Sequence, residues 1–179
     1  MLGVRRVFAG VSGSPGGVHA LRQAAELARH HDALLILLLA WVPPGGNVNE
    51  RKDPCPEVRQ LWEDQAWQRL WEALDTAFGG LPAGLATQPV VLRGKPGRAL
   101  SLLARQPGDL LVIGAGRGGP LRRMGGGGVA RYCLAHACCP VLAIPPPALA
   151  QEAGHGLRGW AFRHRGLDPS QVSLPGQTT

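Results

Sequence analysis

The chain has 179 residues, 45% of them hydrophobic and 17% charged, and this length suits one globular core better than two. Its 26 glycines and 16 prolines fall between apolar blocks, which excludes a wholly disordered protein. The formal net charge of +7 favours negatively charged partners, such as phosphate-bearing ligands, nucleic acid or an acidic protein face.

The apolar segments are too short for a membrane span or a secretion signal. The longest run, residues 33–42, is about half of the roughly 20 residues that a membrane-spanning helix needs. The N-terminal apolar stretch is shorter than the core of a signal peptide. The four cysteines, two of them adjacent, lack the spacing of a secreted disulfide framework. We therefore predict a cytoplasmic protein with reduced thiols and no membrane partner.

Apolar blocks alternate along the chain between strand-like and helix-like patterns. Strands are predicted at residues 4–11, 34–42, 89–92, 110–113 and 141–144. Helices are predicted at residues 19–31, 61–78, 98–105 and 129–137. This alternation predicts an α/β fold with a doubly wound, mostly parallel sheet and helices on both faces.

The character of the sequence changes after Pro145. We predict one α/β domain over residues 1–145 and a basic, Pro/Gly-rich C-terminal tail over residues 146–179. The tail interleaves aromatic and positively charged residues, so an anionic or protein partner is expected there. Nucleic acid is disfavoured, because no RNA-binding module accompanies this segment.

Ligands of open α/β sheets bind beyond the carboxyl ends of the strands, an edge that we call the mouth. The predicted strand ends at residues 11–14, 40–42, 93–95 and 114–119 contain no Asp or Glu. Magnesium-dependent phosphoryl transfer and hydrolysis both need such groups, so we predict neither catalytic residues nor a metal site.

The mouth offers glycine backbone and positive charge instead. Glycines and arginines between residues 114 and 128 lead into the helix predicted to start at Val129, with no acid from residue 110 through 151. Free backbone N–H groups at a helix start bind anions, and phosphate is the natural occupant. The alternative is that the glycines only make a tight connection.

Two enzyme motifs match in part. Residues 114–119 satisfy GxGxxG after a strand, but the acid that should bind the ribose about 20 residues later is missing. Ser12 and Gly13 begin like an SGGxDS pyrophosphatase loop, but the next residues depart from it. An adenylating or NAD(P)-dependent enzyme therefore remains only a weaker alternative.

The segments VRRVFAGVSGS, ALRQAAELARHHDALLILLLAWV and RGKPGRALSLLARQPGDLLVIGAGRGGPLRRMGGGGVARYCLAHACCPVLAIP resemble the universal stress protein family, from Val4 to Pro145. The resemblance implies an adenine-nucleotide alpha hydrolase-like fold whose five-stranded sheet has the order 3-2-1-4-5. It also implies a homodimer through the edge strand from Pro140 to Pro145, and ATP or AMP as ligand.

The family's nucleotide-binding members carry an acid after the first strand and a pattern of glycine, two residues, glycine, nine residues, glycine, and serine or threonine. Gly114 and Gly127 match the first and third glycines. Ser12, Arg117 and Gly128 depart from the acid, the second glycine and the hydroxyl residue. The candidate phosphate contacts are Gly114, Ala115, Arg117, Gly127, Gly128 and Val129. The candidate nucleoside contacts are Val11, Ser12 and Gly13. Trp41 either stacks on the base or fills its place.

The sequence thus predicts a stress-response binding or regulatory protein with a degenerate adenine-nucleotide phosphate loop and at most weak ATP hydrolysis. The alternative is a family member that binds no nucleotide and acts through dimerisation and its tail. Cys133, Cys138 and Cys139 are expected to be buried structural thiols, with redox sensitivity of the adjacent pair as the alternative. Trp67 and Trp71, four residues apart, are expected in the core or an interface.

Overall fold

The computed structural model describes residues 3–44, 55–115 and 128–147. The described strands are β1 (Arg6–Gly10), β2 (Leu34–Trp41), β3 (Thr87–Arg93), β4 (Asp109–Gly114) and β5 (Val141–Ile144). The described helices are α1 (Pro15–His30), α3 (Pro56–Phe78), α4 (Pro96–Leu103) and α5 (Val129–His136). Residues 148–179 lie outside the described part of the chain, so the predicted boundary of the tail stays a prediction.

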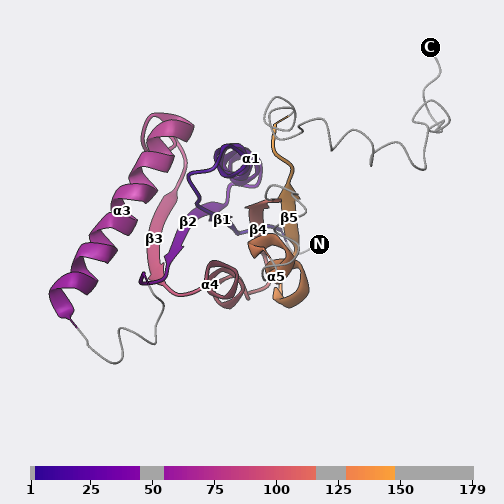
Figure 1. The fold of residues 1–179 in the computed structure, drawn as a ribbon. Coiled ribbons are helices and arrows are strands. Elements are labelled where there is room, and N and C mark those ends of the chain that lie inside the picture. Colours follow the sequence, from indigo (N-terminus) through magenta and orange to yellow (C-terminus); the bar gives the residue numbers. More distant parts are fainter. Residues whose placement is uncertain (1–2, 45–54, 116–127, 148–179) are drawn as a thin grey trace, which may run out of the picture. The chain divides into compact units, whose positions relative to one another are not determined.

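The five strands form one parallel sheet in the order β3-β2-β1-β4-β5 (Figure 1). Gly10 of β1 lies opposite Leu38 of β2, and Ala9 lies opposite Val112 of β4. All strands run the same way, so their carboxyl ends meet at one edge of the sheet. The predicted doubly wound α/β fold and its strand order are confirmed.

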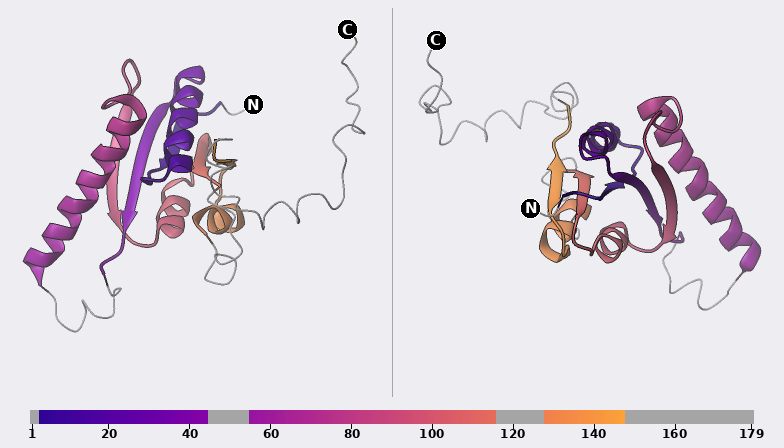
Figure 2. Two further views of the ribbon diagram at one scale, coloured as in Figure 1. Left: turned by 45° about the horizontal axis from the view of Figure 1, so that its top comes forward. Right: turned by 180° about the vertical axis from the view of Figure 1, so that it is seen from behind.

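Helices cover both faces of the sheet because successive strand residues alternate between two apolar layers (Figure 2). Val7 and Ala9 of β1 point into the layer beneath α1 and α3, whereas Phe8 points into the layer beneath α4 and α5. These three side chains are at most 2% exposed. A central parallel strand covered on both sides accounts for the unbroken apolar runs in the sequence.

The structure shifts some predicted boundaries. β3 begins at Thr87 rather than at residue 89. α4 opens at Pro96, as expected from the fixed φ of proline at a first helical position, and ends at Leu103 rather than at residue 105. The apolar residues of α3 also divide between two environments. Leu70 and Leu74 are buried, but Leu61 is 54% and Trp71 is 44% exposed, so Trp71 is not a core residue and its predicted alternative, a position in an interface, stays a prediction.

A partly buried ion pair holds β1 to β4 at the edge opposite the mouth. Arg6 Nε and Nη2 each donate to a carboxylate oxygen of Asp109 at 2.8 Å. The backbone N–H of Gln106 donates to the same carboxylate, also at 2.8 Å. This carboxylate therefore serves the fold and lies away from the ligand-binding edge.

No helix in the described ranges is both long and apolar enough to span a bilayer.

Candidate functional site

The β1–α1 turn brings the first candidate residues to the mouth. The backbone N–H of Val11 donates to the Leu38 carbonyl at 2.8 Å, which extends the β1–β2 ladder by one residue. The hydroxyl of Ser14 accepts the Gly17 N–H at 3.1 Å and caps α1. The hydroxyl of Ser12 lies 3.1 Å from that of Ser14. Ser12 and Gly13 are exposed, so an incoming ligand can reach the turn.

The end of β4 closes against the first turn of α1. A Cβ atom added to Gly114 would lie 3.1 Å from the carbonyl oxygen of Gly16 and 3.5 Å from the Gly17 nitrogen. These are backbone atoms, so any larger residue at this position would force the start of α1 to shift by a few tenths of an ångström. The N–H of Ala115 donates to Ile144 O at 2.7 Å, beside the edge strand β5. The structure thus brings Ser12, Gly114 and Ala115 together around the start of α1.

The start of α5 supplies backbone donors at the same edge of the sheet. α5 crosses over from β4 to the parallel strand β5, so its N-terminus lies at the carboxyl edge. Gly128 is the N-cap residue, and no side chain caps the helix. The first helical hydrogen bond comes from the Tyr132 N–H to Gly128 O, at 3.0 Å. The N–H groups before Tyr132 therefore have no helical acceptor, and the helix dipole makes this end positive.

The described residues that directly follow β1, β2, β3 and β4 carry no negative side chain. The exposed side chains of Lys95, before α4, and Arg131, in the first turn of α5, add positive charge. Within the described ranges, no group of three or more His, Cys, Asp and Glu side chains is arranged to hold a metal ion. This part of the mouth suits an anion.

Two of the candidate phosphate residues, Arg117 and Gly127, lie outside the described residues. Their roles therefore stay predictions. The described residues on either side of this segment, Ala115 and Gly128, are both exposed.

Trp41 is the last residue of β2 and so lies at the mouth, where its predicted role toward the base stays a prediction, but its ring also belongs to a second feature. Its side chain is 5% exposed and packs in the apolar layer beneath α1 and α3. Its ring centroid lies 6.5 Å from that of Trp62, with the planes inclined at 60°. The guanidinium of Arg93, on the neighbouring strand β3, lies 6.0 Å from the centroid of the Trp41 ring. The ring is therefore fixed between β3 and α3.

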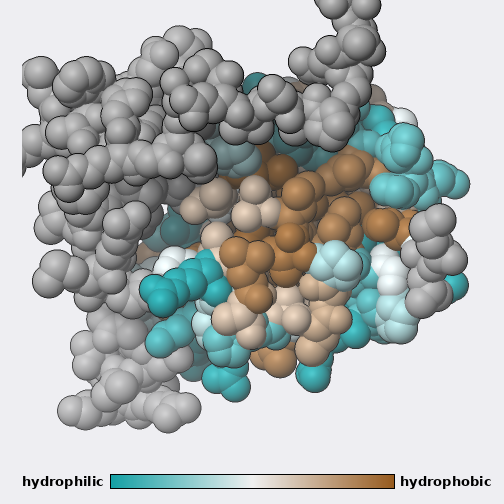
Figure 3. Space-filling model, turned by 90° about the vertical axis from the view of Figure 1, so that its right-hand side faces the viewer, coloured by the Kyte–Doolittle hydropathy of each residue, from teal (hydrophilic) through white to brown (hydrophobic). Residues whose placement is uncertain are grey.

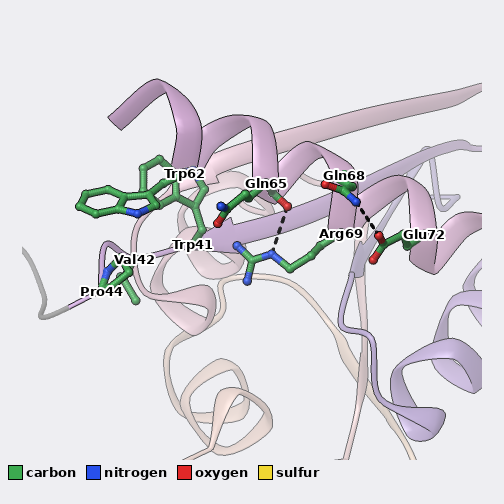
Figure 4. Close-up of a pocket in the computed structure, with 8 residues that line it drawn as sticks. All are labelled: Trp41, Val42, Pro44, Trp62, Gln65, Gln68, Arg69 and Glu72. Carbon is green, nitrogen blue, oxygen red and sulfur yellow. Dashed lines mark hydrogen bonds between the residues drawn. The ribbon is translucent and has the colours of Figure 1, made fainter. Parts of the chain in front are cut away.

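A cavity of about 460 Å³, which we call the indole groove, opens beside Trp41 (Figure 4). The β2 side contributes Trp41, Val42 and Pro44, and the α3 side contributes Trp62, Gln65, Gln68, Arg69 and Glu72. We expected Trp62 on this helix but not the groove. The available signal was the spacing of Trp62, Gln65, Arg69 and Glu72, which places them on one helix face beside the buried stripe of Ala66, Leu70 and Ala73.

The cysteines divide into three environments. Cys133 is fully buried, and its Sγ lies 3.7 Å from Gly97 O. Cys139 is half-buried, and burial raises the pKa of both thiols, which keeps them protonated and weakly nucleophilic. Cys138 is exposed, so the expectation of a buried thiol was wrong at that position. The redox sensitivity of Cys138 and Cys139 stays a prediction.

The family model for the universal stress protein family matches residues 3–145. This covers well over half of the chain, and the chain therefore belongs to the universal stress protein family. Comparison with curated protein sequences found no match.

Solved structures of family members share the fold. The chain is similar to universal stress protein UspA from Lactobacillus plantarum, at 20% identity and a TM-score of 0.53, over 79% of this chain and 97% of that one. It is similar to a universal stress protein in complex with cAMP, at 24% identity and a TM-score of 0.61, over 81% and 99%. It is also similar to a universal stress protein family protein from Arabidopsis thaliana with AMP bound, at 20% identity and a TM-score of 0.50, over 80% and 93%.

Proposed function

We propose that this protein binds the phosphate group of an adenine nucleotide, ATP or AMP, at the mouth and acts as a binding or regulatory protein. The observation that carries the proposal is the uncapped start of α5 at Gly128, together with the lack of Asp and Glu in the described residues that directly follow β1 to β4. Family members that bind cAMP or AMP have the same fold, which supports a nucleotide as the ligand.

The same chemistry favours binding over turnover. Phosphoryl transfer needs oxygen ligands for Mg²⁺ and a group that orients the attacking nucleophile. Ser12 stands where the family's nucleotide-binding members carry an acid, and its hydroxyl is not a base at neutral pH. We therefore propose that a bound nucleotide is retained rather than hydrolysed at this site.

Replacing Gly128 with aspartate tests the phosphate site. Nothing lies within 4 Å of a Cβ added at Gly128, and its φ of −55° suits any residue, so the substitution leaves the fold unstrained. The new carboxylate sits at the positive end of α5 and repels phosphate there. We expect calorimetric titration with AMP to show an affinity at least about tenfold weaker than that of the unmodified protein.

Gly128→Asn is the matched control, because asparagine caps the helix like aspartate but carries no charge. We expect Gly128→Asp to bind AMP more weakly than Gly128→Asn. Equal affinities in all three proteins would place the phosphate elsewhere. An unmodified protein that binds neither AMP nor ATP, with or without Mg²⁺, would instead favour the family member that acts without nucleotide.

We further propose a homodimer through β5, the edge strand within residues Pro140 to Pro145. In the described structure β5 pairs only with β4, which leaves its outer edge open. Figure 3 shows apolar side chains gathered on the face that carries α5 and β5, where Leu134 is 61% and Leu142 is 39% exposed. The opposite edge strand, β3, contains Pro89, which cannot donate to a new strand.

A charge placed on β5 tests this interface. Leu142→Arg buries a guanidinium beside its symmetry mate, and we expect light scattering to show a monomer where the unmodified protein is a dimer. Leu81→Arg, at a residue that is 49% exposed and lies outside β5 and α5, is the control and should leave the mass unchanged. A monomeric unmodified protein at micromolar concentration would refute the edge-strand dimer.

A further inference from the structure

The indole groove has an aromatic end and a polar side. Trp62 is partly exposed and lies beside the buried Trp41, with the two ring planes inclined at 60°, so a ligand would meet mainly the indole of Trp62. Aromatic ligands pack well on such inclined ring pairs. The volume of about 460 Å³ lies within the range of small-molecule sites, roughly 300–1,000 Å³.

Arg69 supplies the charge of the groove. Its Nε donates to the Gln65 carbonyl at 3.2 Å, one turn earlier on α3, and this bond fixes the plane of the guanidinium. Figure 4 shows the group extending along the groove toward the indole end. Among the described residues, no carboxylate forms an ion pair with Arg69. Its terminal nitrogens are therefore available for a two-pronged bond to a carboxylate.

The other polar side chains of the groove are either neutral or already engaged. Gln68 Nε2 donates to Glu72 Oε1 at 3.0 Å, which holds the single acidic group of the described lining against its own helix. The Gln65 side chain lies beside the Arg69 guanidinium in Figure 4 and can donate or accept. A ligand that fills the groove therefore contacts the indoles at one end and the positively charged guanidinium of Arg69 at the other.

We infer that the indole groove binds small aromatic carboxylates, with the ring against Trp62 and Trp41 and the carboxylate on Arg69. This site lies between the carboxyl end of β2 and α3, and we propose that it is distinct from the phosphate site at the start of α5. Its chemistry differs from that of the phosphate site, because a side-chain guanidinium and two indoles take the place of backbone N–H groups.

Calorimetric titration with naphthalene-2-carboxylate and with its neutral amide tests the inference. We expect the carboxylate to bind at least about tenfold more tightly than the amide, because only the carboxylate accepts a charge-assisted pair of bonds. Arg69→Gln should remove this preference and leave the amide affinity unchanged. Trp62→Ala should weaken both ligands. Arg29→Gln, another exposed arginine on a helix, is the control and should change neither.

Equal binding of the acid and the amide, or an Arg69→Gln protein that retains the preference, would overturn the inference, as would the absence of binding at millimolar ligand. Addition of AMP separates the two sites. We expect AMP to leave the affinity for naphthalene-2-carboxylate unchanged, whereas competition would make the groove part of the nucleotide site and would also overturn the inference. A protein that binds AMP but not the carboxylate would contradict this inference alone.

Discussion

Asp109→Asn is expected to lower the free energy of unfolding by about 3 kcal/mol, because it leaves the Arg6 guanidinium without its buried counterion. Asp109 is 3% exposed, whereas the Arg6 side chain is 28% exposed, so residual hydration of Arg6 keeps the loss at the lower end of the range for buried pairs. Urea denaturation at neutral pH measures the effect. A loss below about 1 kcal/mol would show that the pair contributes no more than a surface ion pair.

The same pair predicts how stability depends on pH. Burial by itself would raise the pKa of Asp109, but the hydrogen bonds from Arg6 and from the Gln106 N–H outweigh burial and hold the pKa below the ordinary value of 3.8. A lowered folded-state pKa stabilises the protein fully above the ordinary value, and this contribution is lost as the pH falls through the folded-state pKa. Asp109→Asn should therefore flatten the stability curve below about pH 4. Glu26→Gln, which breaks an exposed pair with Arg29, should not.

Gly17→Ala is expected to destabilise the protein by about 2 kcal/mol and to displace the β1–α1 turn of the candidate site. The added Cβ would overlap the hydroxyl of Ser12 and lie 2.5 Å from its carbonyl oxygen. The hydroxyl can rotate away, but the carbonyl belongs to the backbone and can move only with the turn. Urea denaturation measures the loss, and weaker AMP binding should accompany it.

Gly16→Ala, one residue earlier, is the matched control. There the nearest atoms to the added Cβ are Pro146 Cβ at 3.6 Å and Cα at 3.8 Å, which are ordinary contacts. Alanine also costs less conformational entropy than glycine in a helix, so this variant should be as stable as the unmodified protein or up to about 1 kcal/mol more stable. Equal losses at both positions would show that the close contact with Ser12 is not the cause.

The fold could be predicted from the sequence because strands and helices alternate clearly and the breakers fall between them. The predicted strand and helix boundaries were less accurate where the local sequence is compatible with both a strand and a loop. Thr87 and Gln88 extend β3 because pairing with Leu35 and Ile36 recruits them, and no local apolar pattern marks them. Trp71 shows the limit of a spacing rule, since its ring stacks on Trp67 at 6.5 Å and yet remains 44% exposed.

The positions of the described candidate phosphate residues could be predicted from the sequence, whereas the orientation of Trp41 could not. Ser12, Gly114 and Gly128 could be placed at one edge because parallel strands end together. The orientation of Trp41 could not be predicted, because it depends on which face of β2 lies beneath α3 and on Trp62, a residue distant in sequence. The indole groove depends on the same packing, so it became visible only in three dimensions.

A crystal structure of the protein soaked with AMP tests the central claim most directly. We predict density for the phosphate at the start of α5, within hydrogen-bond distance of the backbone N–H groups that follow Gly128, and no metal ion beside it. Phosphate density held by an aspartate or glutamate through a cation, or a mouth that stays empty while AMP occupies another surface, would contradict the account.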